Sequence, residues 1–452
     1  MPPFSYHNGR LHCEGVPLPD IAAAVGTPVY IYSRAELSQR AARYRQAAAA
    51  ASSRHLVCYA LKANNNPTLL RLLAEAGLGA DVTSGGELFL AGQTGFAPEK
   101  TIFSGVGKTR AEIEAALTTG IRALHVESAM ELAVVREVAA SHGQAAAIGV
   151  RLNPDVSTTT HPHISTGRQS HKFGVDFDQA VALLRQAADD PWLRPVGLAA
   201  HIGSQIADLA PFVTMAEILC AAASELAAAG ILLEYLDVGG GLAIDYAGEA
   251  VPAVPEVEQW VTAVAKPVAA AGYKLVMEPG RSLVGPAGAL LTQVLYTKQQ
   301  GQKQFVICDA GMTELIRPAL YDAQHPIWPV VQRPGARMAG ARMAGARMAG
   351  ARMAGARMAG ARITADVVGP VCETGDYLGR ERSLPAVQAG DWLAVLQTGA
   401  YGFAMSSNYN GRLRPAEVLV SADQFQLIRR RQTREQLLDG TQFSLVNRGN
   451  AR

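Results

Sequence analysis

Apolar runs typical of β-strands alternate with alanine- and leucine-rich helical stretches from about residue 35 to 285. The predicted strands are residues 56–62, 79–84, 101–105, 123–128, 146–153, 196–204, 235–241 and 274–281. Predicted helices between them include residues 67–77, 85–95, 109–120 and 207–230. Repeated strand–helix alternation indicates a parallel sheet, and eight repeats over some 250 residues predict a closed, TIM-like (β/α)8 barrel.

The pattern changes after residue 290, where short, β-branched segments are separated by Gly, Pro or polar turns without helical spacers. This texture predicts a mostly antiparallel C-terminal β domain. Residues 28–33 (PVYIYS) form a further strand candidate, expected to join that domain. The predicted division is therefore an N-terminal segment at 1–34, the barrel at 35–285 and the β domain at 286–452.

Residues 335–362 read GARMA five times and then GAR. A period of five matches neither a helix nor a strand, so no single face becomes apolar. Removing 25 residues would leave QRPGARITADVVGP, a smooth passage from loop into strand. We expect a low-complexity surface-loop expansion of poor order. A basic docking arm, and a segment that disables the approach to Cys372, are the alternatives.

Composition and charge exclude several classes of function. The five repeat copies supply five of the 41 basic residues, which leaves 36 against 39 acidic ones, so the rest of the chain is mildly acidic and nucleic acid is not an expected partner. We expect no membrane span, since no apolar run reaches the roughly 18 to 20 residues needed, and no secretory signal is visible at the N-terminus. Five scattered cysteines without a CxxC pair predict neither a disulfide framework nor a metal site. A cytoplasmic location fits this pattern.

Unusual polar residues gather where the predicted barrel strands end. Lys62 interrupts an apolar strand just before Asn-Asn-Asn-Pro. Comparable strand-end positions are Asp81, Arg151, His201, Gly239, Gly240, Gly241, Glu278, Gly280 and Arg281. Chemistry in such barrels collects at the carboxyl ends of the strands. A lysine, a histidine, a glycine-rich turn and a strand-end glutamate together indicate a site for pyridoxal 5'-phosphate.

A series of motifs resembles one enzyme family. In chain order they are ALKANNNP, ADVTSGGEL, HPHISTG with HKFGVD, HIGSQ, DVGGGL, EPGR, CETGD and GAYGFAMSSNYNGR. Together they are similar to the diaminopimelate decarboxylases, pyridoxal-phosphate enzymes built on an alanine-racemase-like barrel. The resemblance covers about residues 28 to 420, and the GARMA repeat is its one clear departure.

The resemblance implies a role for each cofactor-site residue. Lys62 becomes the Schiff-base lysine, and partial burial is expected to ease its deprotonation. Glu278 faces the pyridine nitrogen and keeps it protonated, which favours decarboxylation over racemisation. His201 stacks on the cofactor ring. Residues expected to hold the phosphate are Gly239, Gly240, Gly241, Gly280, Arg281, Ser204 and Tyr401. Residues expected to support the lysine and the cofactor are Asp81, Glu87 and Arg151.

The resemblance also implies substrate contacts. Cys372 becomes the proton donor to the α-carbon, beside Asp376 in the same motif, and Glu373 reads the distal amine. The expected clamp for the distal carboxylate is Arg281, Arg317 and Tyr321, with Tyr401 nearby. In this family the Cys372 segment reaches the neighbouring subunit's active site, which implies a homodimer with shared sites.

The activity expected from the resemblance is decarboxylation of meso-2,6-diaminopimelate to L-lysine and CO2. A sibling decarboxylase of ornithine, arginine or a carboxylated polyamine is one alternative. A cofactor-binding relative that has lost catalysis is the other.

Overall fold

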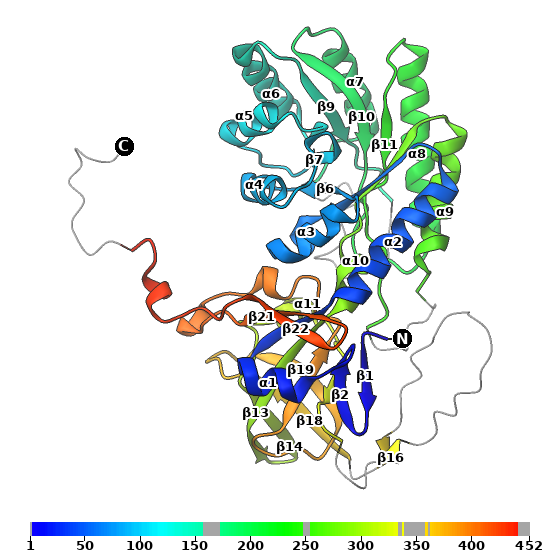
Figure 1. The fold of residues 1–452 in the computed structure, drawn as a ribbon. Helices are drawn as coiled ribbons and strands as arrows, with labels where there is room; N and C mark the ends of the chain where they lie inside the picture. Colours follow the sequence, from blue (N-terminus) through cyan, green and yellow to red (C-terminus); the bar gives the residue numbers. More distant parts are fainter. Residues whose placement is uncertain are drawn as a thin grey trace, which may run out of the picture.

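The computed structural model describes residues 2–156, 172–246, 254–332 and 362–441, and the backbone of 337–338 and 358–359. It contains a barrel, in the upper half of Figure 1, and a β-rich part, in the lower half. The repeat thus lies almost entirely outside the described residues, as does most of the HPHISTG…HK motif pair.

Eight strands close the barrel, and every neighbouring pair is parallel. They are β5 (His55–Ala60), β6 (Gly79–Val82), β7 (Thr101–Phe103), β8 (Ala123–Val126), β9 (Ala146–Arg151), β10 (Leu193–Ala199), β11 (Tyr235–Asp237) and β12 (Lys274–Met277). Each lies within or overlaps one predicted strand, and β12 pairs with β5 to complete the ring. The predicted barrel is confirmed.

Helices surround the barrel strands (Figure 1). They are α2 (Arg34–Ala51), α3 (Pro67–Glu75), α4 (Gly85–Gln93), α5 (Arg110–Thr119), α6 (Ala129–His142), α7 (Phe177–Ala188), α8 (Ala210–Ala228) and α9 (Val257–Ala270). Side-chain caps mark several of their beginnings. Ser84 and Ser128 accept the backbone N–H three residues on, and Thr109 with Glu112 forms a complete capping box.

Helix α8 corrects one expectation. Among the helices that the structure describes, it is long and apolar enough by length and composition to cross a membrane. Its residues Phe212, Met215, Leu219 and Leu226 are nevertheless fully buried, and the helix packs against α7, α9 and β10. The run therefore has the length of a span, but its apolar side belongs to the barrel core.

The β-rich part is built on one nine-stranded sheet. Its strands are β4 (Val29–Ser33), β13 (Gly288–Gln300), β14 (Lys303–Cys308), β15 (Ile327–Pro329), β18 (Arg362–Val368), β19 (Tyr377–Pro385), β20 (Trp392–Leu396), β21 (Ala416–Ser421) and β22 (Gln424–Arg429). Most pairs are antiparallel, but β14 with β18 and β4 with β21 are parallel. The N-terminal strand β4 lies between β13 and β21, which confirms that it joins the C-terminal sheet.

Smaller elements complete the chain. They are the sheet β1 (Phe4–His7), β2 (Arg10–Cys13) and β3 (Val16–Pro17), helices α1 (Leu18–Val25), α10 (Arg281–Val284) and α11 (Arg317–Tyr321), and the pair β16 (Arg337–Met338) and β17 (Met358–Ala359). One-turn 3-10 helices include Leu61–Ala63, which carries Lys62. The exact domain boundaries at residues 34 and 285 stay a prediction.

Candidate active site

A cavity of about 440 Å³ lies at the carboxyl ends of the barrel strands. Every barrel strand has a polar residue at its end or just after it: Lys62, Asp81, Ser104, His125, Arg151, His201, Asp237 and Glu278. All of these except Asp81 and Asp237 line the cavity. Arg317, Tyr321 and Tyr401 come to the cavity from the β-rich part. The wall is therefore built by both parts of the chain.

Lys62 is paired with a buried carboxylate. Its Nζ lies 3.2 Å from Oδ2 of Asp81, which is fully buried at the end of β6. Burial lowers the pKa of Lys62, but the charges of Asp81 and Glu278 outweigh burial and raise its pKa above the ordinary value. The expectation of easier deprotonation is wrong for the chain by itself, because the two neighbouring carboxyl groups stabilise the ammonium form more than burial destabilises it.

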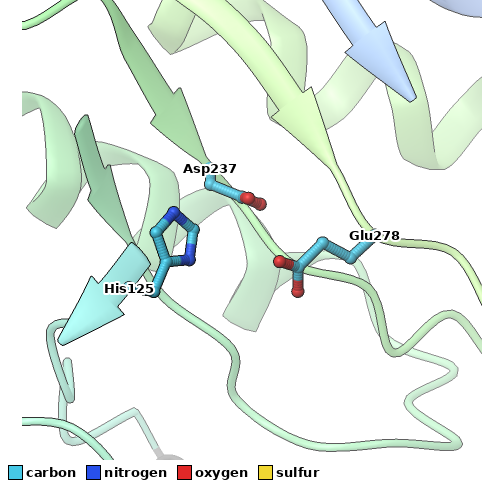
Figure 2. Close-up of side chains that lie close together, drawn as sticks. All are labelled: His125, Asp237 and Glu278. Carbon is cyan, nitrogen blue, oxygen red and sulfur yellow. The ribbon is translucent and has the colours of Figure 1, made fainter. Parts of the chain in front are cut away.

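Glu278 is part of a buried cluster with Asp237 and His125 (Figure 2). Their ligand-type atoms all lie within 4.8 Å of one another. Burial, and then the neighbouring carboxyl groups Asp237 and Asp81, hold the pKa of Glu278 well above its usual range. Burial also raises the pKa of Asp237. Two buried carboxyl groups this close resist being ionised together.

His125 connects this cluster to its surroundings. Its Nε2 lies 2.8 Å from the hydroxyl of Tyr235, and its Nδ1 lies 3.3 Å from the hydroxyl of Ser104. Ser104 in turn donates to Oε1 of Glu278 at 3.5 Å. Burial lowers the pKa of His125 to about 3, so the ring is neutral. Because both ring nitrogens have partners, the cluster is better suited to directing protons than to holding a metal ion.

His201 follows β10 and the glycine turn follows β11, the neighbouring barrel strand. The backbone N–H of Gly240 donates to Nδ1 of His201 at 3.2 Å, which leaves the hydrogen on Nε2. Burial, followed by the positive charge of Lys62, holds the pKa of His201 well below its usual range. A Cβ on Gly240 would come within 2.2 Å of the carbonyl oxygen of Glu278, so only glycine fits this approach of two strand ends.

Two arginines bring positive charge into the cavity without carboxylate partners among the described residues. Arg281 donates from Nε and Nη2 to Ser204 and from Nη1 to the Tyr246 hydroxyl at 2.7 Å. Arg317, 4 % exposed, donates from Nη1 to Nε2 of His325 at 2.7 Å, while its buried Nε has no partner. The cavity is therefore prepared to bind anions.

Comparison with known proteins matches this geometry to a family. A model of the pyridoxal binding domain of pyridoxal-dependent decarboxylases matches residues 34–285. The diaminopimelate decarboxylase of Neisseria meningitidis serogroup A is 45% identical over 94% of this chain and 97% of its own length. The chain belongs to the diaminopimelate decarboxylase family. The relative from Aquifex aeolicus is 42% identical over 97% of both chains.

Solved structures of the family have the same fold. Diaminopimelate decarboxylase from Helicobacter pylori, complexed with L-lysine, has a TM-score of 0.84 and 36% identity, covering 93% of this chain and 98% of that one. The M. jannaschii enzyme, in co-complex with L-lysine, has a TM-score of 0.87 and 33% identity, covering 98% of both chains.

The cavity brings together many of the residues predicted for the site. Those that line it are Lys62, Arg151, His201, Ser204, Glu278, Arg281, Arg317, Tyr321 and Tyr401. Asp81 contacts Lys62 from behind, and Glu87 accepts hydrogen bonds from Thr83, another cavity residue. Gly280 packs beneath Ala63, and Tyr401 donates its backbone N–H to the carbonyl of Ala63 at 2.7 Å. Their individual roles stay predictions.

The CETGD motif lies apart from this cavity. Cys372 is exposed, its backbone N–H donates to Asn410 at 3.0 Å, and neither it nor Glu373 lines the cavity of its own chain. Asp376 is buried instead, and accepts hydrogen bonds from the backbone of Met312 and Val371. The motif is thus a rigid turn that presents its cysteine outward.

Sequence reasoning missed Ser104, His125, Asp237, Tyr246 and His325 as members of the site. Apart from Asp237, which begins the DVGGGL motif, each is a single polar or aromatic residue outside the motifs. Asp237 had a usable signal, since it immediately precedes the glycine turn in YLDVGGG. His125, inside the strand ALHV, lies at a strand end equivalent to the positions that were singled out.

The residues present fit pyridoxal phosphate. Lys62 supplies an amine, Glu278 a buried carboxyl group, and Arg281 with Ser204 a set of anion-binding donors, all around one cavity. The glycine turn does not line that cavity, and the backbone N–H groups of Gly239 and Gly240 donate to Asp237 and His201. Gly239 has φ +62°, and a Cβ there would meet His201 at 2.7 Å, so the turn stays open only with glycine. The described residues thus satisfy the three chemical needs of this cofactor: attachment, charge at the ring and phosphate binding.

Proposed function

We propose that this chain decarboxylates meso-2,6-diaminopimelate to L-lysine and CO2 with pyridoxal phosphate, the last step of lysine biosynthesis. Support comes from curated family members that are 38–45% identical over nearly the whole chain and carry this enzyme name. Two similar structures were solved with L-lysine, the product of this reaction. Pyridoxal phosphate supplies the electron sink for the carbanion that loss of CO2 leaves.

The observation that carries the substrate assignment is Arg317. Its guanidinium is 4 % exposed, contacts a neutral histidine and has no carboxylate partner in the described chain. A buried charge of this kind is stabilised by an anion bound in the cavity. Diaminopimelate has a second carboxylate at its far end, whereas ornithine, arginine and lysine have none. Arg317 therefore favours diaminopimelate over the simpler amino acids.

The other predicted site residues have separate roles in binding the cofactor and the substrate. Lys62 would hold the cofactor through its amine, which Asp81 orients. Glu278 would hold the ring nitrogen, Arg281 with Ser204 would hold the phosphate, and His201 would cover the ring. Tyr321 contacts the distal end of the substrate beside Arg317.

Cys372 needs a second subunit to take part. It is exposed and does not line its own chain's cavity, so protonation of the α-carbon by its thiol requires that it reach a neighbouring chain's cavity. We therefore propose a homodimer with shared active sites, in which Cys372 and Glu373 complete the partner's site. All five cysteines are free, which fits the cytoplasmic location proposed from the sequence.

The test is CO2 release from meso-diaminopimelate by purified protein with added pyridoxal phosphate. Lys62→Ala should lower the rate by more than about hundredfold, because attachment of the cofactor depends on this amine. Lys298→Ala, which changes an exposed lysine of β13, is the matched control and should keep the wild-type rate.

The same assay separates the alternatives. Release from ornithine or arginine in preference to diaminopimelate would replace the substrate assignment with a sibling activity. A Lys62-dependent cofactor absorbance without CO2 release from any of these amino acids would identify a relative that binds the cofactor but has lost catalysis.

A further inference from the structure

Asp237 lies between the glycine turn that follows β11 and the carboxyl group of Glu278. Its Oδ1 accepts a hydrogen bond from the backbone N–H of Gly239 at 2.8 Å, which fixes the start of the glycine turn. Its Oδ2 is fully buried and has no hydrogen-bond partner in the described chain. Figure 2 shows the carboxyl group directed toward Glu278, within the 4.8 Å cluster.

The carboxyl groups of Glu278 and Asp237 differ in their access to the cavity. Glu278 lines the cavity and also receives the hydroxyl of Ser104, whereas Asp237 does not line the cavity. A positively charged ring N–H entering the cavity therefore meets Glu278 and favours its anionic form. Asp237 then keeps its buried, unpaired oxygen beside an anion, where a proton stabilises it.

We propose that Asp237 is protonated in the cofactor-bound enzyme and donates a hydrogen bond from Oδ2 to Glu278, which makes it a positioning residue for that carboxylate. The inference rests on the proposed cofactor site. It links the glycine turn at the phosphate end to Glu278 at the ring nitrogen through a single side chain.

In the chain by itself the contact between the two carboxyl groups lowers the pKa of Asp237 and raises that of Glu278, so the ring N–H of the cofactor is what moves the proton to Asp237. Asp81 on β6 adds a further negative charge that disfavours two ionised carboxyl groups. Lys62 after β5 opposes it, but its ammonium group is paired with Asp81. His125 on β8 is neutral, and burial raises the pKa of Cys58 on β5 so that it is neutral too.

The experiment compares Asp237→Asn with Asp237→Ala. An asparagine can accept from Gly239 and donate its amide to Glu278, as a protonated aspartic acid does, but it has no proton to lose. We expect Asp237→Asn to bind pyridoxal phosphate within about threefold of wild type, and Asp237→Ala to bind it roughly ten- to hundredfold more weakly. An asparagine variant as weak as the alanine variant would overturn the proposal.

Infrared spectroscopy of the holoenzyme gives a direct second readout, which also covers an alanine variant that fails to fold. Wild type should show the carbonyl band of a protonated carboxylic acid, and Asp237→Asn should lack it. Glu314→Gln is the matched control, since burial also raises the pKa of Glu314, and that variant should keep the band assigned to Asp237. A spectrum from which Asp237→Asn removes no carbonyl band would overturn the proposal. Failure of wild type to bind the cofactor through Lys62 would instead overturn the proposed function.

Discussion

Arg317 keeps its positive charge available to bind a substrate carboxylate because its partner His325 is neutral. Burial, followed by the charge of Arg317, holds the pKa of His325 well below its usual range. Its Nε2 therefore accepts from Arg317, while its Nδ1 donates to the carbonyl of Leu396 at 2.9 Å. A carboxylate in place of His325 would position the arginine equally well, but it would neutralise the charge that substrate needs.

Replacing Arg317 should impair the reaction of substrates with a distal carboxylate. We expect Arg317→Met to lower kcat/KM for meso-diaminopimelate roughly 10- to 150-fold, because a hydrogen bond to a charged group contributes about 1.5–3 kcal/mol. Cofactor absorbance should not change. Steady-state kinetics would show this, with Arg185→Met on the surface of α7 as control. An unchanged kcat/KM would remove Arg317 from substrate binding.

The site could be predicted from sequence where a functional residue stands within a recognisable motif. Lys62 in ALKANNNP and Glu278 in EPGR were found in this way, and both line the cavity. Asp237 and His125 were missed because each is one polar residue in an apolar run. They meet only when β8, β11 and β12 are placed around the barrel, which no local pattern reveals.

At the scale of elements, local pattern determined the barrel better than the β-rich part. Barrel strands are buried on both faces and separated by helices, so each apolar run can be recognised by itself. Strand β19 has a weak local signal, because its segment YLGRERSLP contains exposed charged residues and few apolar ones. The parallel pairing of β4 with β21 joins residues almost 400 positions apart and has no local signal.

The GARMA repeat is inserted between the segment that ends at Gln332 and strand β18, and both are held in place by contacts outside the repeat. Gln332 donates its backbone N–H to Gly9 at 2.7 Å, and β18 pairs with β14 and β19 through described residues. Backbone pairing of β16 with β17 brings the two ends of the repeat together. Deleting residues 338–362 would put Arg337 before Ile363, where Arg362 now stands, so β18 would keep its first residue type.

We therefore expect this deletion to leave CO2 release within about twofold of wild type. The chain between Gln332 and β18 would shorten from 29 to 4 residues, which should raise the free energy of unfolding by roughly 1–2 kcal/mol from loop closure. Denaturant unfolding and the CO2 assay measure the two effects. A sharp rise in activity would instead show that the repeat disables the enzyme. Replacing its five arginines by serine at constant length separates charge from length.

At the scale of the whole molecule, the two parts of the chain are joined at the catalytic lysine. Tyr401 donates its backbone N–H to Ala63, and Asn64 donates its side chain to the carbonyl of Gly399 at 2.9 Å, so the β-rich part fixes the turn that carries Lys62. Strand β4 of the nine-stranded sheet is followed directly by α2 of the barrel. A single chain thus builds the cofactor site rigidly, yet leaves Cys372 outside it.

A heterodimer of two damaged chains tests whether the site is shared. In a Lys62→Ala chain paired with a Cys372→Ala chain, one of the two shared sites would contain both an intact Lys62 and an intact Cys372. Co-expression with two different tags and purification through both should yield about half the wild-type rate, whereas each variant homodimer should be nearly inactive. Cys220→Ala, a change on barrel helix α8, is the control for the loss of a cysteine and should keep full activity. If the heterodimer is no more active than its parents, Cys372 does not serve the partner's cavity, because two sites contained within single chains could not restore each other.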